Sequence, residues 1–311
     1  MRRTFLTVAA AVSTSKFVLA LALLACCKSV VAQSCPPAEF SRERLLKLRE
    51  QQFNLDDSQK ANELAMALLP CLASEDPQLR DAIAYEAIAT WARGKQLAAS
   101  TARDMLAKLL PQIAQDYPEG PGFTKPFSAL VLAEIARMDR IEPFLDDAGR
   151  KAFVAAAASY VGSVDDYRGY DEAVGWRHGV AHGADLLMQL ALNPRVDAEG
   201  LRAILDAVAI QVSPARTHFY IYGESARLAR PIVFAARRQL LSASDWQSWL
   251  ARITAASPLT SWDDAFSSQT GLAKRHNTQA FLTAVFTMLR DEPDAQKVLR
   301  EPLVHALSQV P

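Results

Sequence analysis

The chain has 311 residues, half of them hydrophobic, which is enough for a sizeable core in one or two domains. Its 34 basic residues balance 34 acidic ones, so no strongly basic character points to nucleic acid as a partner. Only 12 residues are glycine, and alternation with a period of two is almost absent, which argues against a fold built on β-sheets.

Residues 1–32 are predicted to form a signal peptide that is removed on export. Basic residues precede an apolar run at 17–25, and small residues at 30–32 offer a cleavage site before Gln33. We therefore expect a periplasmic or secreted bacterial protein, in which residues 33–311 form a single all-α domain.

Cys26 offers an alternative processing site. The sequence LLAC at 23–26 resembles the lipobox of bacterial lipoproteins, which would leave a lipid anchor on Cys26. Cleavage after Ala32 is the favoured reading, because CCKS at 26–29 is a reasonable polar region before such a site. No other apolar run reaches the roughly 18 residues needed to span a bilayer.

Export also bears on charge and on the cysteines. Removal of residues 1–32 takes away four basic residues and no acids, which leaves 30 basic against 34 acidic residues and a net charge of −4. This negative charge argues further against nucleic acid. Two cysteines remain, Cys35 and Cys71, and an even number in an oxidising compartment predicts that they form a disulfide.

From residue 39 onward, apolar residues recur at helical spacing between short polar or proline-containing segments. Helices are predicted at 39–53, 57–70, 77–92, 101–116, 127–140, 147–163, 171–192, 198–212, 224–241, 245–255, 262–272, 278–290 and 294–308. Only 217–222, THFYIY, looks β-like, and it is too short and isolated to be more than an extended connection. Pairs of helices at intervals of about 40 residues predict an irregular α-solenoid, an α-α superhelix of HEAT- or armadillo-like pairs, with a closed α/α arrangement as the alternative.

The predicted helix 171–192 carries a polar stripe although it is apolar elsewhere. At about 100° per residue, the stripe residues fall within roughly 40° of one another. They are Asp171, His178, His182, Asp185 and Gln189. Trp176 lies opposite them and is predicted to be part of the core. Such a helix is either central to the domain, with its polar groups partnered, or one wall of a cleft.

A metal site is one interpretation of this stripe. His178 and His182 are spaced i, i+4, as in zinc-binding helices. His178 and Asp185 would lie about 10.5 Å apart along the axis, so at most two of these three side chains could bind one zinc or iron ion. Glu224, His218 or Asp171 would have to complete the set. The favoured expectation is no cofactor.

Two other interpretations remain open. His182 and Asp185 could pair with Arg168, Arg227 or Arg275 in a buried network, since buried polar groups need partners. Alternatively, His178, His182, Asp185 and Glu224 could perform general acid–base catalysis in a cleft. The simplest roles for Glu224 and Asn277 are support of a first helical turn and an N-cap, respectively.

Five short motifs resemble a known bacterial family. They are RGY at 168–170, GW at 175–176, AHGAD at 181–185, GE…RLA within 223–229, and R…N…FL within 275–282. Through these motifs the chain resembles the family called domain of unknown function 2785. The resemblance covers roughly residues 40 to 290. The resemblance implies a helical fold and assigns no activity. It adds Tyr170 to the residues that could line a ligand pocket or join a buried network, which are Arg168, Tyr170, Asp171, Trp176, Arg227, Arg275 and Asn277.

The sequence thus predicts an exported helical-repeat protein that binds another exported protein or a small polar ligand. Solenoid folds present extended concave surfaces suited to such binding. The alternative is an α/α hydrolase or lyase. A pocket around His178, His182, Asp185 and Glu224 with His182 open to solvent would favour the enzyme, and a sealed stripe would favour the binding protein.

Overall fold

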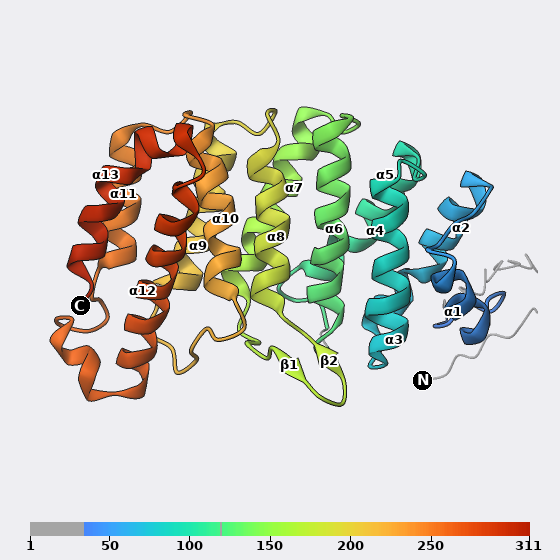
Figure 1. Ribbon diagram of the computed structural model, residues 1–311, viewed down its shortest axis with the longest axis horizontal. Helices are drawn as coiled ribbons and strands as arrows, with labels where there is room; N and C mark the ends of the chain where they lie inside the picture. The colour runs from blue at the N-terminus through green and yellow to red at the C-terminus, as the bar shows by residue number, and fades with distance from the viewer. Residues whose placement is uncertain (1–33, 119) are drawn as a thin grey trace, which may run out of the picture. The chain divides into compact units, whose positions relative to one another are not determined.

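The computed structural model describes residues 34–118 and 120–311, and there the fold is all-α apart from one pair of two-residue strands (Figure 1). The α-helices are α1 Arg42–Glu50, α2 Ser58–Leu68, α3 Pro77–Leu79, α4 Glu86–Arg93, α5 Ala99–Leu109, α6 Thr124–Ile141, α7 Asp147–Ser163, α8 Gly179–Leu192, α9 Ala198–Val212, α10 Glu224–Arg237, α11 Ala243–Thr254, α12 Gln269–Leu289 and α13 Pro293–Gln309. Between them lie 3₁₀ turns η1 Leu69–Ala73, η3 Pro111–Ile113 and η4 Asp263–Ser267, the π-helix η2 Arg80–Tyr85, and strands β1 Tyr170–Asp171 and β2 Gly175–Trp176. The predicted signal peptide and the lipidation alternative at Cys26 lie outside the described residues.

The helices pack in chain order in two layers (Figure 1). In one layer α4, α6, α8, α10 and α12 each contact the next, and in the other α7 contacts α9, which contacts α11. Helix α13 packs against α10, α11 and α12. These packed helices confirm the predicted all-α fold. No helix in the described part of the chain is both long enough and apolar enough to cross a membrane.

Helix α8 makes the most extensive helix–helix contacts, with α6 on one side and α10 on the other. Its leucines, Leu186, Leu187 and Leu190, are buried because both flanks are covered. Gly183 lies where α8 approaches α7, and a Cβ there would meet Cγ2 of Val161 at 2.6 Å. The apolar character of α8 therefore follows from its central position.

The predicted helix 171–192 is wrong in its first eight residues. Residues 170–176 form a hairpin in which Tyr170 pairs with Trp176 and Asp171 with Gly175, and α8 begins only at Gly179. Gly175 has φ +73°, a left-handed conformation that a helix cannot contain. The prediction that Trp176 belongs to the core fails for the same reason, since Trp176 is 37% exposed.

The predicted break between helices 262–272 and 278–290 is also wrong. A single helix, α12, runs from Gln269 to Leu289 after the 3₁₀ turn η4. The polar residues that suggested the break are accommodated inside the helix, because Lys274 donates to the Ser213 carbonyl and Asn277 bonds to the segment before α10. Asn277 is therefore a buried helical residue and not an N-cap.

Two smaller predictions are confirmed. Residues 217–222 form an extended connection without strand pairing. Trp246 and Trp249 of α11 are core residues, with ring centroids 5.9 Å apart in an edge-to-face arrangement.

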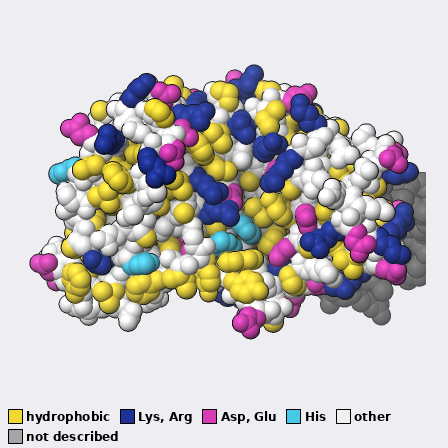
Figure 2. Space-filling view, viewed as in Figure 1, with side chains coloured by type: hydrophobic (Ala, Val, Ile, Leu, Met, Phe, Trp, Pro, Cys, Tyr) yellow, Lys and Arg dark blue, Asp and Glu magenta, His cyan; other side chains and the backbone are white. Residues whose placement is uncertain are grey.

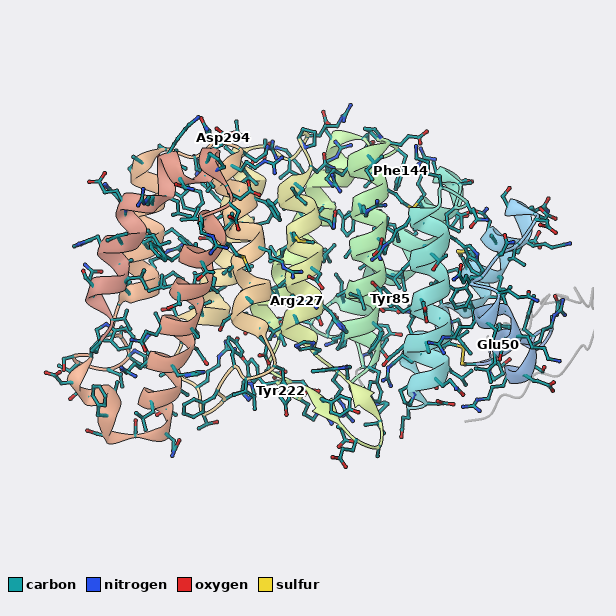
Figure 3. All side chains as sticks on the ribbon, viewed as in Figure 1. Glu50, Tyr85, Phe144, Tyr222, Arg227 and Asp294 are labelled. Carbon is teal, nitrogen blue, oxygen red and sulfur yellow. A yellow bond between two sulfur atoms is a disulfide. The ribbon has the colours of Figure 1, made fainter. Side chains whose placement is uncertain are left out.

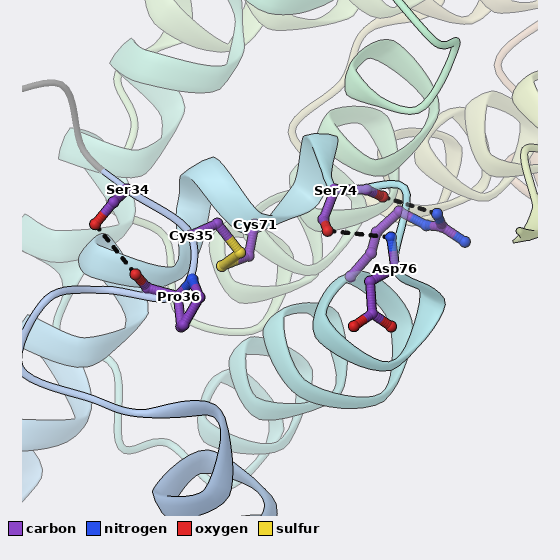
Figure 4. The surroundings of a disulfide bond; sticks show 7 residues. Ser34, Cys35, Pro36, Cys71, Ser74 and Asp76 are labelled. Atoms are coloured by element: carbon purple, nitrogen blue, oxygen red, sulfur yellow. Dashed lines mark hydrogen bonds between the residues drawn. A yellow bond between two sulfur atoms is a disulfide. The ribbon is translucent and has the colours of Figure 1, made fainter.

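The predicted disulfide is present between Cys35 and Cys71 of η1, 36 residues apart in sequence (Figure 4). It joins the first described residues to the end of α2. The next turn is fixed by hydrogen bonds, because the Asp76 amide donates to Ser74 Oγ at 3.2 Å and Arg42 pairs with Asp76 at 2.9 Å. The N-terminal segment is thus held both covalently and by charge.

Candidate functional site

Asp185 of α8 faces α10, where it meets two arginines one turn apart. Arg227 donates to Asp185 Oδ2, and Arg230 Nη1 lies 3.5 Å from Oδ1. Burial raises the pKa of Asp185, and the two guanidinium groups oppose that rise. Of the three arginines named from the sequence, Arg227 is therefore a partner of Asp185, and Arg230 was missed.

The two histidines occupy different settings. His178 precedes α8 with φ +58°, its ring is stacked on Trp176 at 4.7 Å, and its Nε2 lies 3.1 Å from the Tyr222 carbonyl. His182 is only 8% exposed and packs edge-on against Phe127 at 5.1 Å. Burial first, and then nearby positive charge, lowers the pKa of His178 to about 4 and that of His182 to about 3. Both rings are therefore neutral at pH 7.

The stripe continues onto α6 and α4 through Glu134. This buried carboxylate accepts hydrogen bonds from Arg93, and the Tyr85 hydroxyl lies 3.5 Å from its Oε1. Burial, followed by the Glu134 charge, raises the pKa of Tyr85 to about 12. The sequence did offer a signal here, because Glu134 is a lone acid in the apolar run at 129–136. In Figure 3, Tyr85 and Arg227 lie at a similar level on the same face.

We call this set of side chains the paired stripe: Tyr85, Arg93, Glu134, His182, Asp185, Arg227 and Arg230. Its carboxylates are buried and each has at least one arginine partner. Within residues 34–118 and 120–311, no group of three or more His, Cys, Asp or Glu side chains could hold a metal ion. Of the predicted buried network, the structure contains the Asp185–Arg227 pair, whereas Nδ1 of His182 has no hydrogen-bond partner among the described residues.

A different kind of site lies where the hairpin meets the segment before α10. A hollow of about 530 Å³, the hairpin hollow, opens there. Its lining combines aromatic and charged side chains with Ile221, and consists of Asp165, Asp166, Tyr167, Arg168, Gly169, Tyr170, Asp171, Arg177, His218, Ile221 and Tyr222. Figure 2 shows hydrophobic side chains gathered at the lower edge of the face, below a pair of histidines. None of His178, His182, Asp185 and Glu224 lines this hollow.

Exposed aromatic rings surround the opening of the hairpin hollow. Tyr170 is 51% exposed, and its ring lies 5.1 Å from that of Trp176. The Trp176 ring in turn meets Tyr222 edge-on at 5.8 Å, and Figure 3 labels Tyr222. Such rings are usually buried, so a group of partly exposed rings beside a hollow indicates a surface that contacts a ligand.

Remote residues hold the hairpin in place. Arg80, fully buried on η2, donates to the Val174 carbonyl at 2.8 Å. The Phe123 ring lies between Arg80 and Arg177, at 4.0 and 4.5 Å from their guanidinium carbons. π-Helical segments such as η2 are frequent at functional sites, and here one directs Arg80 toward the hairpin. These contacts make the hollow preformed.

Gly169 explains part of the RGY motif. A Cβ at this position would overlap the ring of Tyr222, so only glycine allows that ring to lie against the backbone of the hairpin. Arg168 bonds to Asp166 at 2.5 Å, and Asp171 Oδ1 accepts from the amides of Ala173 and Val174 in the hairpin turn. Arg168 and Asp171 therefore shape the wall of the hollow and do not join the paired stripe.

His218, which lines the hollow, lies close to Glu224, which does not. The His218 ring is stacked on Tyr167 at 4.9 Å, and its Nε2 is 4.0 Å from Glu224 Oε1. Glu224, the first residue of α10, is buried and accepts from the Tyr222 amide at 2.8 Å. Burial lowers the pKa of His218 and raises that of Glu224.

Asn277 supports this segment by accepting from the Tyr220 amide and donating to the His218 carbonyl. Arg275 instead lies over the Phe266 ring at 5.1 Å.

Fold and site together define an all-α protein of stacked helix pairs with a ligand-sized hollow at one edge. The chain belongs to the family described as Protein of unknown function (DUF2785), whose model matches residues 110–287, more than half of the chain. The match contains the paired helices from α6 to α10 and the hairpin hollow, whereas α1 to α5 precede it. Comparison with curated proteins and with solved structures gave no match.

Proposed function

We propose that this chain is an exported binding protein that holds a small polar ligand in the hairpin hollow. The observation that carries the proposal is the contrast in access. Asp185 is paired with Arg227 and His182 is only 8% exposed, whereas Tyr170 and Trp176 are exposed beside a hollow of about 530 Å³. That volume is within the range of roughly 300–1,000 Å³ typical of small-molecule sites.

The lining of the hollow indicates the kind of ligand. Tyrosine rings can contact an apolar or aromatic face, while carboxylates and guanidinium groups can bond to polar substituents. A compound with both features, such as a sugar or an aromatic amine, fits this lining. The second partner considered from the sequence, another exported protein, would have to insert a side chain into the hollow.

Ligand titration tests the proposed site. The fluorescence of the purified protein is followed while sugars, amines and amino acids are added, since the Trp176 ring contacts Tyr222 of the lining. Tyr170→Ala should abolish binding of any compound found. Asp185→Asn, in the paired stripe, should leave binding unchanged. The opposite pattern would contradict the proposal.

Export is part of the proposal and has its own test. The Cys35–Cys71 disulfide supports it, because disulfides persist mainly in oxidising compartments. Mass spectrometry of the unreduced periplasmic protein should find an N-terminus at Gln33 and no alkylatable thiol. A lipid-modified Cys26 would instead establish the lipoprotein alternative, and a chain that retains residues 1–32 in the cytoplasm would refute export.

A second candidate function is acid–base catalysis by His218 and Glu224. It is favoured by one observation, the 4.0 Å approach of these side chains with His218 lining the hollow. A carboxylate that orients a histidine can assist proton transfer. Mass spectrometry of compounds incubated with the protein separates this candidate from simple binding. Turnover that His218→Gln abolishes would establish catalysis, and unchanged compounds would exclude it for the panel tested.

A further inference from the structure

A second hollow, of about 270 Å³, lies where the end of α4 and the start of α5 meet the C-terminal half of α6. We call it the α6 hollow. Its lining combines apolar and charged side chains, and consists of Ala92, Arg93, Lys95, Leu97, Ala98, Ala99, Arg137, Met138, Ile141, Glu142 and Phe144. Figure 2 shows lysine and arginine side chains gathered on the upper half of the face, over α6.

The charges of the α6 hollow are not balanced. Arg93 is paired with Glu134, which leaves two cations of the lining, Lys95 and Arg137, against one acid, Glu142. The nearby Glu134 is already engaged, because it accepts from Arg93 and lies 3.5 Å from the Tyr85 hydroxyl. Among residues 34–118 and 120–311, Arg137 has no ion pair with a carboxylate. A basic surplus of this kind attracts anions.

Arg137 has a second cation, Arg140, close to it on α6. Arg140, one turn further along α6, donates to Gln189 Oε1 at 3.3 Å and has no carboxylate partner in the described part of the chain. Burial, and then the charge of Arg137, lowers the pKa of Arg140. Two like charges thus remain close together on one helix, which is unfavourable for folding alone. A bound anion would offset the repulsion.

The apolar side of the hollow is fixed in advance. Ile141 is 46% exposed and Phe144 is half-buried beside it. The backbone of Phe144 is held at both ends, since its amide donates to Asp139 Oδ1 at 3.0 Å and its carbonyl accepts from Arg103 at 2.8 Å. Asp139 is itself bonded to Arg150 at 2.9 Å. This wall can therefore receive an apolar group without rearrangement. Figure 3 labels Phe144 at the upper end of the helices.

We propose that the α6 hollow binds a small organic carboxylate with an apolar tail, the carboxylate against Arg137 and the tail against Ile141 and Phe144. A guanidinium group matches a carboxylate in shape and charge, and hydrogen bonds between charged partners are stronger than those between neutral ones. The hollow is separate from the hairpin hollow, so the inference does not depend on the proposed function.

Calorimetric titration at pH 7.5 with octanoate tests the inference. The full-length mature protein should bind one octanoate per chain, and octanol should bind at least about tenfold more weakly because it lacks the charge. Arg137→Gln should weaken octanoate binding by a similar factor. Ile141→Asn should weaken it through loss of apolar contact. Both side chains are partly exposed, so these variants should fold.

Arg237→Gln is the matched control. Arg237 is also a partly exposed helical arginine, and it lies 3.7 Å from Glu292 on the far side of α10 from this hollow's lining. Its replacement should leave octanoate affinity unchanged. The inference is overturned if octanoate does not bind, if octanol binds as tightly, or if Arg137→Gln and Arg237→Gln behave alike.

Discussion

The paired stripe and the hairpin hollow both contain arginines, carboxylates and histidines, and they meet at the start of α8. They differ in whether these groups have partners within the protein or face solvent. In the stripe, carboxylates from α6 and α8 are buried against arginines of α4 and α10. At the hollow, a hairpin and an extended segment leave aromatic rings and charged groups facing solvent. Helices thus bury their polar groups in pairs here, while the loops between them leave polar groups available to a ligand.

The largest expected effect is the difference in stability between a variant that lacks a buried tryptophan and one that lacks an exposed tryptophan. Trp246→Ala should lower the free energy of unfolding by about 3–5 kcal/mol, because the side chain is fully buried. Trp176→Ala should lower it by about 1 kcal/mol or less, since the ring is partly exposed. Urea unfolding of both variants measures the difference. Equal losses would show that the hairpin is part of the core.

Acid should weaken the stripe through His182. The unfolded chain binds a proton at His182 with a pKa near 6.5, and the folded chain only near 3, so this stability is fully present above pH 6.5 and is lost as the pH falls toward 3. The slope is about 1.4 kcal/mol per pH unit for each such histidine. His182→Gln should therefore flatten the dependence of unfolding free energy on pH between 6.5 and 4.

The matched control for that profile is His305→Gln, on exposed surface of α13. His305→Gln should reproduce the wild-type dependence on pH. If His182→Gln also does so, then His182 is accessible to protons in the fold and the stripe is not sealed.

The hairpin depends on a glycine that has no bearing on the stripe. Gly169→Ala should displace the Tyr222 ring, reducing stability by about 1–3 kcal/mol and altering Trp176 fluorescence. Gly162→Ala on α7 is the control, because its Cβ would meet Ile210 at an ordinary 3.4 Å. A Gly169→Ala protein with unchanged melting temperature and fluorescence would disprove the close packing.

The smallest effect concerns the central ion pair. Asp185→Ala should reduce stability by only about 1 kcal/mol, because Arg227 and Arg230 are partly exposed and can turn to water. His182→Ala should cost about 2 kcal/mol, and the double variant less than the sum, since Arg227 acts on both residues. Thermal unfolding of the three variants checks this. Strict additivity would mean that the two residues are independent.

Periodicity was sufficient to predict the all-α fold and the shared helix face of His182 and Asp185, but it left Arg168, Arg227 and Arg275 as equal candidates for the partner of Asp185. The hairpin was missed because strands of two residues have no period to detect. Its anchor, Arg80, lies 94 residues from Val174 in sequence and left no local signal. Gly169 and Gly175 are the sequence features that argue against a continuous helix here, since glycine favours conformations that helices exclude.

Hydroxyl-radical footprinting with mass spectrometry tests the central claim most directly, because it reports the exposure of individual aromatic and imidazole side chains in the folded protein. The account predicts rapid oxidation of Tyr170 and Trp176 at the hairpin hollow, and protection of His182 comparable to that of the buried Trp246. Oxidation of His182 as fast as that of the exposed His305, or protection of Tyr170 and Trp176 in the protein without ligand, would contradict it.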